Sequence, residues 1–352
     1  MDKAGIRVLL THELFVPDYA GGGEIMVLEI ARELQRRGVL ARVLTTGDPR
    51  NTHYEGIPTV RLPIPRHAFN LAVHKIVENA RDVDIIQTFN YHACLPSLMA
   101  GRWLDKPVVC LFLGIIQSTW TETHGPLFGR ARILWERFLL TRGFSRVLFL
   151  SEDNRDLAVR LGVSHKRARV NLPGTPSDVL GPVREKHKEV LFVGKFDARK
   201  GVYDVLEVAR ALPQIHFRMI GYRGKEEDLR QTAPPNVEIS SFQERGALQE
   251  AFARASIFFL PSKGEGFPVA LTEAMASGCA VVSSVPLTFE GISVGPGDRK
   301  QMVEAISRLW SDPAETARMG KENVELAKAY TWERHVDMLL RTYRETLEDQ
   351  TG

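Results

Sequence analysis

Short apolar runs alternate with helical patterns along the whole chain, and this alternation limits the possible folds more than any other feature of the sequence. The first half contains runs suited to strands at 6–10, 42–45, 59–62, 84–88, 107–113, 146–150 and 168–171. Helical patterns stand between most of them, at 24–37, 69–80, 92–104, 129–141 and 152–161. Strands that alternate with helices predict a parallel sheet with helices on both faces.

A stretch rich in proline, glycine and charge interrupts the pattern at 173–188 and predicts a linker. The alternation then restarts, with expected strands at 190–193, 216–220, 237–240, 257–260 and 280–283. Expected helices lie at 202–212, 246–254, 268–277 and 299–311, and a long polar helical segment, 313–350, closes the chain. We therefore predict an α/β protein with two Rossmann-like domains, 1–172 and 189–330. Ligands are expected beyond the carboxyl ends of the strands, in a central cleft that both parallel sheets face.

Composition excludes several other classes of protein. The 352 residues are 44% hydrophobic and 25% charged, which is the balance of a globular protein and not of a disordered or fibrous one. The net charge of +3 is too small to indicate nucleic-acid binding. Residues 1–185 carry 24 basic and 19 acidic side chains, so the first half is the better candidate to meet an anionic surface or substrate.

The three cysteines, Cys94, Cys110 and Cys279, are far apart in the sequence and form no CxxC pair. This spacing argues against a disulfide framework and a structural zinc site, and a reducing cytoplasm is the expected location. The first residues lack the pattern of a signal peptide, and the longest uncharged runs are too short for a membrane span.

The segment 261–284 carries the most informative chemistry. It predicts a turn after a buried strand and then a helix, with Glu265 in the turn, Glu273 in the helix and seven residues between them. The free N–H groups of a helix start bind anions, and a carboxylate binds a vicinal diol through charged hydrogen bonds. A phosphate flanked by diols describes a nucleotide-sugar. Either glutamate alone would also fit a turn cap or a solvated helix face; the string as a whole favours the nucleotide-sugar.

This segment resembles the Glu-x7-Glu motif of retaining glycosyltransferases with the GT-B fold, the large family 4 group. The resemblance implies that Glu265 holds hydroxyls of the transferred sugar and that Glu273 holds the ribose diol. It also implies donor contacts from the residues of the turn and the helix start, which are Gly266, Phe267, Pro268 and Val269.

A second match is the stretch 192–201, which resembles the family's strand followed by Gly-Arg and Lys-Gly, whose two cations hold the donor diphosphate. Lys200 matches the family lysine. Lys195, after Gly194, stands where arginine is usual and keeps the charge without the bidentate fork. Arg199 is a possible substitute, and a plain turn is the structural alternative for Lys200 and the glycine after it.

A third match is the glycine run at 21–23, followed by Glu24, which resembles the family's loop near the phosphates and the donor sugar. Glycine permits close approach of a ligand to the backbone, so Gly22 and Gly23 are expected to bind the donor. The run is not GxGxxG, which argues against a dinucleotide site. Thr331 and Trp332 open a final helix, 331–352, which in the family usually packs back on the first domain.

The sequence departs from the family in places. Leu113 stands where many members have a histidine that contacts the donor sugar, and His92 and His124 are possible substitutes or structural residues. The Asn-Gly-x-Asp turn of the family is replaced at 171–175. The loop between 284 and 297 is short and retains only Glu290 as an acid. These changes bear on donor specificity.

The stretch 129–146 interleaves five arginines with aliphatic and aromatic residues. We expect an ordinary helix with its apolar side against the sheet and its arginines in solvent. The alternative is peripheral contact with the inner face of a membrane, because relatives with lipid-linked acceptors often carry a basic, aromatic helix in this domain.

Taken together, the resemblance implies a cytoplasmic retaining hexosyltransferase that moves a sugar from a nucleoside diphosphate to an acceptor hydroxyl by front-face attack. The resemblance also implies that no metal or cofactor is needed, because the leaving phosphate takes the proton of the acceptor. The acceptor is a glycan, a lipid-linked sugar or a small metabolite. A nucleotide-sugar 2-epimerase and a non-catalytic binding protein of the same fold remain as alternatives.

Overall fold

The computed structural model describes residues 5–19, 21–115, 117, 120–121, 125–175, 186–224, 226–241, 245–265 and 267–351. It divides into two compact units, each with its own parallel sheet. Unit 1 contains Met1–Pro173 and Trp332–Gly352, and unit 2 contains Gly174–Thr331. The predicted α/β class with two parallel-sheet domains is confirmed.

Unit 1 is built on an eight-stranded sheet with the order β3-β4-β2-β1-β5-β6-β7-β8, in which only β3 is antiparallel to its neighbour. The strands are β1 (Arg7–Thr11), β2 (Leu40–Thr46), β3 (His53–Tyr54), β4 (Ile57–Leu62), β5 (Ile85–Phe89), β6 (Val108–Phe112), β7 (Arg146–Phe149) and β8 (Ala168–Val170). β6 is a continuous apolar run, and β5 is buried at every position although it includes Gln87 and Thr88, as expected for strands covered on both faces.

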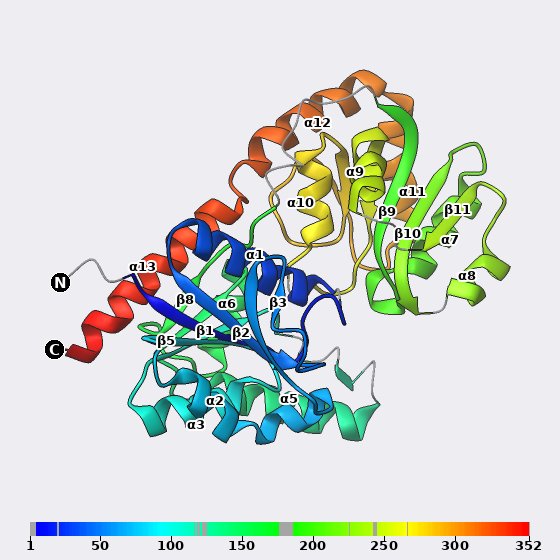
Figure 1. Cartoon of the computed structure of the whole chain (residues 1–352). Coiled ribbons are helices and arrows are strands. Elements are labelled where there is room, and N and C mark those ends of the chain that lie inside the picture. Colours follow the sequence, from blue (N-terminus) through cyan, green and yellow to red (C-terminus); the bar gives the residue numbers. More distant parts are fainter. Residues whose placement is uncertain are drawn as a thin grey trace. The chain divides into compact units, whose positions relative to one another are not determined.

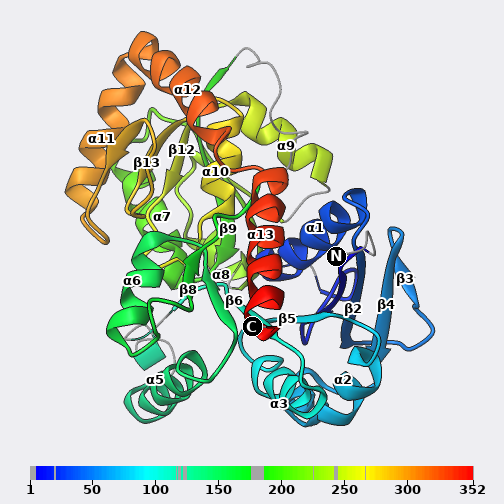
Figure 2. The same cartoon turned by 90° about the vertical axis from the view of Figure 1, so that its left-hand side faces the viewer.

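Helices cover both faces of this sheet (Figures 1 and 2). One face carries α1 (Gly22–Arg36) and the C-terminal α13 (Trp332–Thr351), which pack against each other. The other face carries η1 (Arg66–Leu71), α2 (Val73–Ala80), α3 (Cys94–Leu104), α5 (Pro126–Leu140) and α6 (Glu152–Arg160), over one continuous apolar core. Buried Tyr343 of α13 donates its hydroxyl to Gln87 of β5, so the end of the chain is part of unit 1.

Unit 2 has a six-stranded parallel sheet with the order β11-β10-β9-β12-β13-β14. Its strands are β9 (His187–Phe196), β10 (Phe217–Gly224), β11 (Val237–Ser241), β12 (Ala255–Leu260), β13 (Ala280–Ser283) and β14 (Gly291–Ser293). Its helices are η3 (Ala198–Lys200), α7 (Val202–Ala211), α8 (Glu226–Thr232), α9 (Arg245–Arg254), α10 (Val269–Ala276), α11 (Arg299–Ser311) and α12 (Pro313–Ala327). α10 packs between α9 and α12, and α7 packs against α11.

Several predicted boundaries were wrong. β9 begins at His187, inside the predicted linker, because its polar first residues form an exposed strand end; residues 176–185 of that linker lie outside the described part of the chain. The segment 313–350 is two helices and not one. The break occurs because Thr175 pairs with Thr331 and its N–H donates to the Tyr330 carbonyl. The short elements β3, β14 and α8 were not predicted.

No described helix is long and apolar enough to cross a membrane.

Candidate active site

The two best sequence motifs meet at the carboxyl ends of β9 and β12, which are neighbours in the sheet of unit 2. β9 leads into the turn that contains Lys200, and β12 leads into the turn that contains Glu265. Because both strands run parallel, turns that are 65 residues apart in the chain emerge side by side. This edge is where open α/β sheets bind ligands.

Glu265 is the centre of this arrangement. Lys200 Nζ lies 2.5 Å from Glu265 Oε1, and Arg199 NH1 lies 3.6 Å from Glu265 Oε2. The Glu265 side chain is 5% exposed and that of Lys200 is 18% exposed. Two cations therefore share one largely buried carboxylate, so the three side chains carry a net positive charge toward an incoming anion.

Backbone contacts fix the two turns to each other. Lys263 N–H donates to the Arg199 carbonyl at 2.8 Å, and the Arg199 guanidinium donates to the Gly264 carbonyl. Gly201 has φ +75°, and a Cβ at this position would lie 2.1 Å from the Pro261 carbonyl oxygen. Only glycine permits both this conformation and this close approach. The Lys-Gly pair is thus a fitted junction between the turns.

Lys195 does not join this group. Its nearest described anion is Asp197, with Nζ 3.5 Å from Oδ2, and its side chain is 45% exposed. Asp197 instead caps η3 by accepting the Lys200 N–H at 3.1 Å. Gly194 lies beneath the Lys200 stem, since a Cβ there would be 3.9 Å from Lys200 Cδ. Arg199, which was predicted only as a substitute, is the second cation at Glu265.

The segment after Glu265 enters α10, which begins at Val269 with Pro268 at its N-cap. Gly266 lies outside the described residues. The Phe267 ring packs on Tyr330 with ring centroids 5.7 Å apart. Glu273 is half-buried in the middle of α10, and its helix is held to the chain start of unit 2 by a hydrogen bond from Thr175 to Thr272 at 2.8 Å.

The glycine run of unit 1 is the first turn of α1 and not a loop before it, since the helix begins at Gly22 and Gly21 is its N-cap. A Cβ at Gly23 would lie 2.9 Å from Leu113 Cδ1 and 3.8 Å from His12 Nε2. Leu113, at the predicted family histidine position, therefore packs against this turn. Around Gly22, a Cβ would meet nothing within 4 Å.

Polar residues that we did not predict lie at the same edge of unit 1. His12 and Glu13 follow β1, Asn90 follows β5, and all three are buried. Asn90 Oδ1 accepts the Leu113 N–H at 2.7 Å, and His12 Nδ1 lies 2.6 Å from the Leu14 carbonyl oxygen. These residues could have been predicted from the sequence, because each lies directly after a predicted parallel strand, where such sheets bind ligands.

The remaining predicted positions have structural partners. His92 Nδ1 contacts Asn70 Nδ2 at 2.8 Å, and His124 lies outside the described residues. Asn171 is buried, 3.4 Å from Nε2 of His335. The Glu290 backbone is held on both sides by the buried amide of Asn323.

The expectation for 129–146 was right for the arginines of α5, which are exposed, and for Leu139 and Leu140, which are buried. It missed a second apolar face of α5, which is turned to solvent. The face contains Leu127, Leu134 and Phe138, whose spacings of seven and four residues put them on one side of the helix. Phe128 and Trp135 lie beside them. Eight of the eleven exposed large hydrophobic residues among the described side chains lie on η1, α3 and α5: Leu71, Met99, Trp103, Leu127, Phe128, Leu134, Trp135 and Phe138.

The buried side of α5 combines Leu139 and Leu140, which join the apolar core of unit 1, with the carboxylate of Glu136. Glu136 is 1% exposed and accepts from the Tyr91 hydroxyl at 2.6 Å and from Gln117 Nε2 at 2.7 Å. Arg142 lies over the Phe138 ring, 4.0 Å from its centroid. The helix is thus anchored through two leucines and a carboxylate, and it presents its other large hydrophobic residues to solvent.

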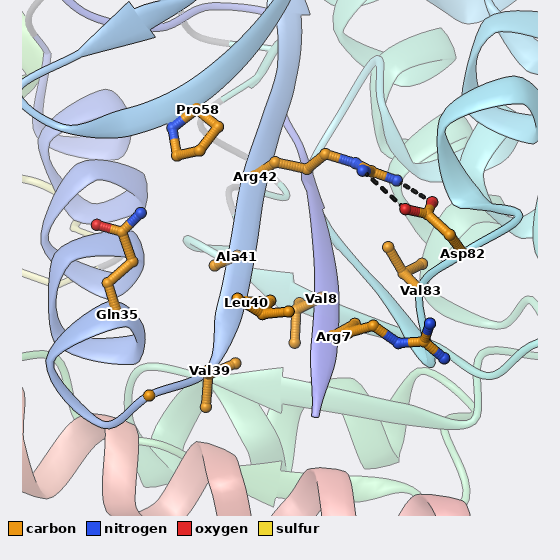
Figure 3. Close-up of a pocket in the computed structure, with 11 residues that line it drawn as sticks. Arg7, Val8, Gln35, Val39, Leu40, Ala41, Arg42, Pro58, Asp82 and Val83 are labelled. Carbon is orange, nitrogen blue, oxygen red and sulfur yellow. Dashed lines mark hydrogen bonds and ion pairs between the residues drawn. The ribbon is translucent and has the colours of Figure 1, made fainter. Parts of the chain in front are cut away.

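A surface cavity of about 340 Å³ lies at the opposite, amino-terminal edge of the unit 1 sheet (Figure 3). It is lined by residues that include Val8, Gln35, Ala41 and Val83, with an ion pair between Arg42 and Asp82 at its rim. None of the predicted site residues lines it. Among the described residues, no three His, Cys, Asp and Glu side chains group so as to hold a metal ion.

Two family models match the chain, and both describe glycosyltransferases. "Glycosyl transferase 4-like domain" matches residues 21–174, and "Glycosyl transferases group 1" matches residues 187–312. The first covers the turn at Gly22 and Gly23, and the second covers the turns at Lys200 and Glu265.

Curated relatives are identical to the chain at about a quarter of the aligned positions. The chain is 26% identical over 365 residues to a phosphatidyl-myo-inositol mannosyltransferase from Mycobacterium leprae, with 93% of each chain covered. It is 25% identical over 306 residues to a GDP-mannose-dependent alpha-mannosyltransferase from Mycolicibacterium smegmatis, with 79% of each covered.

Solved structures share the fold at lower identity. Sucrose-phosphate synthase from Thermosynechococcus elongatus superimposes with a TM-score of 0.83 at 19% identity, over 98% of this chain and 100% of that chain. The Anabaena protein HepE in complex with UDP and glucose superimposes with a TM-score of 0.79 at 18% identity, over 97% and 100%.

Proposed function

Because the chain belongs to the family 4-type glycosyltransferases of the GT-B fold, and so uses a nucleotide sugar, we propose that it transfers a hexose with retention and without a metal ion. One observation carries this proposal: Lys200 and Arg199 converge on the buried carboxylate of Glu265, at the ends of two neighbouring parallel strands. Such a group offers positive charge to a diphosphate and a carboxylate to sugar hydroxyls.

In this mechanism, Lys200 and Arg199 stabilise the negative charge that grows on the leaving diphosphate, where fixed cations lower a barrier most. Lys195 adds a weaker, more exposed charge. The Lys200–Glu265 ion pair keeps both side chains placed before the donor binds. When Lys200 binds the diphosphate, it leaves the Glu265 carboxylate. The Glu265 oxygens then accept hydrogen bonds from hydroxyls of the transferred sugar.

The other donor contacts follow from the family assignment. Glu273 holds the ribose diol, and the α10 start, with Gly266, Phe267, Pro268 and Val269, meets the phosphates. Gly194 lets the donor approach the backbone beneath Lys200. Gly22 and Gly23 do the same in unit 1, and the open space at Gly22 supports that role.

Retention follows if the acceptor hydroxyl attacks from the face that the diphosphate leaves, with a phosphate oxygen taking its proton. Lysine and arginine supply the charge that a divalent ion would otherwise supply. We therefore expect EDTA to leave the transfer rate unchanged and the product to keep the anomeric configuration of the donor. A strict requirement for a divalent ion would contradict the proposed cation roles.

The donor test is a thermal-shift panel of UDP, GDP, ADP, dTDP and their common sugars. A ligand that binds only the folded protein adds about 2.7 kcal/mol of stability at 100 times its Kd. One nucleotide should stand out in the wild type and lose its shift in Lys200→Gln. If no nucleotide shifts the wild type, a non-catalytic protein of this fold becomes the better description.

We further propose that α5 docks on an anionic membrane surface and that the acceptor is lipid-linked. Exposed apolar residues of α5 have arginines on their flanks, including Arg130 and Arg137, and the only acid of the helix, Glu136, is buried. Apolar insertion combined with basic flanks is the chemistry of an interfacial helix. The M. leprae relative is named for a phosphatidylinositol acceptor, which agrees with a lipid substrate.

Sedimentation with vesicles tests the docking. Leu134 and Leu40 are each 67% exposed, on α5 and β2 respectively. We expect Leu134→Gln to weaken binding to phosphatidylglycerol vesicles and Leu40→Gln to leave it unchanged. Equal binding by both variants would mean that α5 does not insert, and equal binding of the wild type to phosphatidylcholine would mean that the arginines do not contribute.

A further inference from the structure

A mixed-charge group lies at the carboxyl edge of the unit 1 sheet. We name it the Glu13 cluster: Glu13, Arg66, Asn70, His92 and Arg132. Its members come from four places in the chain, which are the ends of β1 and β5, the helix η1, and α5. Of these residues, only His92 was considered for the donor, as a substitute for the family histidine.

Glu13 has an incomplete set of partners. The residue is 4% exposed, and its Oε2 has no hydrogen-bond partner among the described residues. Its Oε1 lies 3.7 Å from the Arg66 guanidinium. A buried carboxylate oxygen without a donor is costly and uncommon in folded proteins. The free oxygen is therefore a place for a donor that a ligand brings, and a hydroxyl is such a donor.

Arg66 and Arg132 both act electrostatically on His92 of this cluster. Arg66 is half exposed, and Arg132 stacks on Trp120 with its guanidinium carbon 4.9 Å from the ring centroid. Burial lowers the pKa of His92, and Arg66, Arg132 and His67 lower it further, while Glu13 opposes them. Asn70 Nδ2 lies 2.8 Å from Nδ1 of His92 and fixes the orientation of its ring. One carboxylate and two arginines leave the cluster with a positive charge.

The cluster also borders the apolar surface of α5, because Arg132 belongs to that helix. Its neighbours along the helix, Leu134 and Trp135, are exposed. A ligand held by Arg132 therefore lies at the edge of a hydrophobic, aromatic surface, which is the position of a phosphate between a polar head group and acyl chains.

We infer that the Glu13 cluster binds the acceptor as a phosphorylated polyol, with Arg66 and Arg132 on the phosphate and the Glu13 carboxylate on a ring hydroxyl. This inference rests on the proposed transferase function and adds the acceptor class. Planar guanidinium groups suit phosphate oxygens, and a carboxylate accepts hydroxyl protons. The phosphate can belong to a lipid head group or to a soluble sugar phosphate, since both present the same group.

Binding of acceptor analogues to the whole protein tests this inference and needs no measurement of sugar transfer. The probes are myo-inositol 1-phosphate and myo-inositol, which differ only in the phosphate. Calorimetry and ligand-observed NMR measure the affinity of the protein for each probe. We expect the wild type to prefer the phosphate. Arg66→Gln and Arg132→Gln should each weaken that probe at least tenfold and leave myo-inositol unchanged. Glu13→Gln should weaken myo-inositol at least tenfold.

Matched controls are Arg50→Gln and Glu78→Gln, whose exposed side chains pair only locally with Asp48 and Lys75 among the described residues. The inference fails if Arg66→Gln binds the phosphate like Arg50→Gln, or if the wild type does not distinguish the two probes. Comparing sugar transfer to phosphatidylinositol vesicles with transfer to soluble inositol phosphate shows whether the bound phosphate belongs to a lipid head group or to a soluble sugar phosphate. Nucleotide-sugar binding, measured in the same samples, separates these failures from failure of the transferase proposal.

Discussion

Replacing Gly201 by alanine tests whether the junction between the two turns of unit 2 shapes the donor site. Gly201 follows Lys200 directly, has φ +75°, and leaves no room for a Cβ, which would sit 2.1 Å from the Pro261 carbonyl oxygen. Pro261 begins the turn that carries Glu265. An added methyl group must therefore push the two turns apart, and the Lys200–Glu265 pair with them.

The size of the effect can be worked out from these contacts. A left-handed conformation costs an alanine about 1–2 kcal/mol, and the smaller entropy of the unfolded chain returns about 0.4–1 kcal/mol. Crowding against a backbone that cannot retreat adds about 1–3 kcal/mol. Gly201→Ala should thus lower the free energy of unfolding by about 2–4 kcal/mol.

Gly38 provides the control because its φ is also +75° but a Cβ there would meet nothing within 4 Å. Gly38→Ala carries the conformational cost alone, about 1 kcal/mol or less. Urea denaturation followed by circular dichroism gives both values, and hydrogen exchange in β12 reports locally on unit 2. Calorimetry with the nucleoside diphosphate found in the donor panel should show at least tenfold weaker binding for Gly201→Ala only.

Equal losses of stability in the two variants would refute the close approach at Gly201. Normal nucleotide affinity in a destabilised Gly201→Ala protein would instead show that the junction supports folding and does not position Lys200.

Three further predictions follow from named contacts. Lys200→Gln and Glu265→Gln should be non-additive in denaturation, with a coupling of about 1–3 kcal/mol, because the pair is 2.5 Å apart and mostly buried; additive losses would contradict the pair. Lys195→Gln should weaken nucleotide binding less than Lys200→Gln does in calorimetry, since Lys195 is more exposed and lies beside Asp197; equal weakening would contradict this. Burial lowers the pKa of His335 to about 4, against about 6.5 in an unfolded chain. The unfolded chain therefore takes up a proton first as the pH falls, and stability should drop by about 2 kcal/mol between pH 7 and pH 5; an unchanged pH slope in His335→Gln would contradict it.

Local sequence signals determined most of the α/β pattern. Apolar runs such as 107–113 and 257–260 have few alternatives to buried strands, and glycine and proline mark many of the boundaries. The motif at 261–284 was also readable, because a strand, a turn and a helix start follow one another within a few residues. The resemblance of its glutamates to a known family then gave the reaction class.

Short elements escaped prediction because they have little local signal. β14 has three residues and β3 has two, and both form only against a strand that is already in place. The break between α12 and α13 likewise depends on Thr175, which is more than 150 residues away from Thr331. Sequence windows cannot register a pairing at that distance.

The side chains that meet at the site were decided by the tertiary structure. The sequence alone determined that Lys200 and Glu265 follow strands; the order of the sheet made β9 and β12 neighbours and brought Nζ within 2.5 Å of the carboxylate. The helical spacing of 129–141 fixed which residues of α5 share a face. Only packing decided that Glu136 turns inward and Leu134 outward, because a hydrogen-bonded partner for a buried carboxylate exists only once Tyr91 is in place.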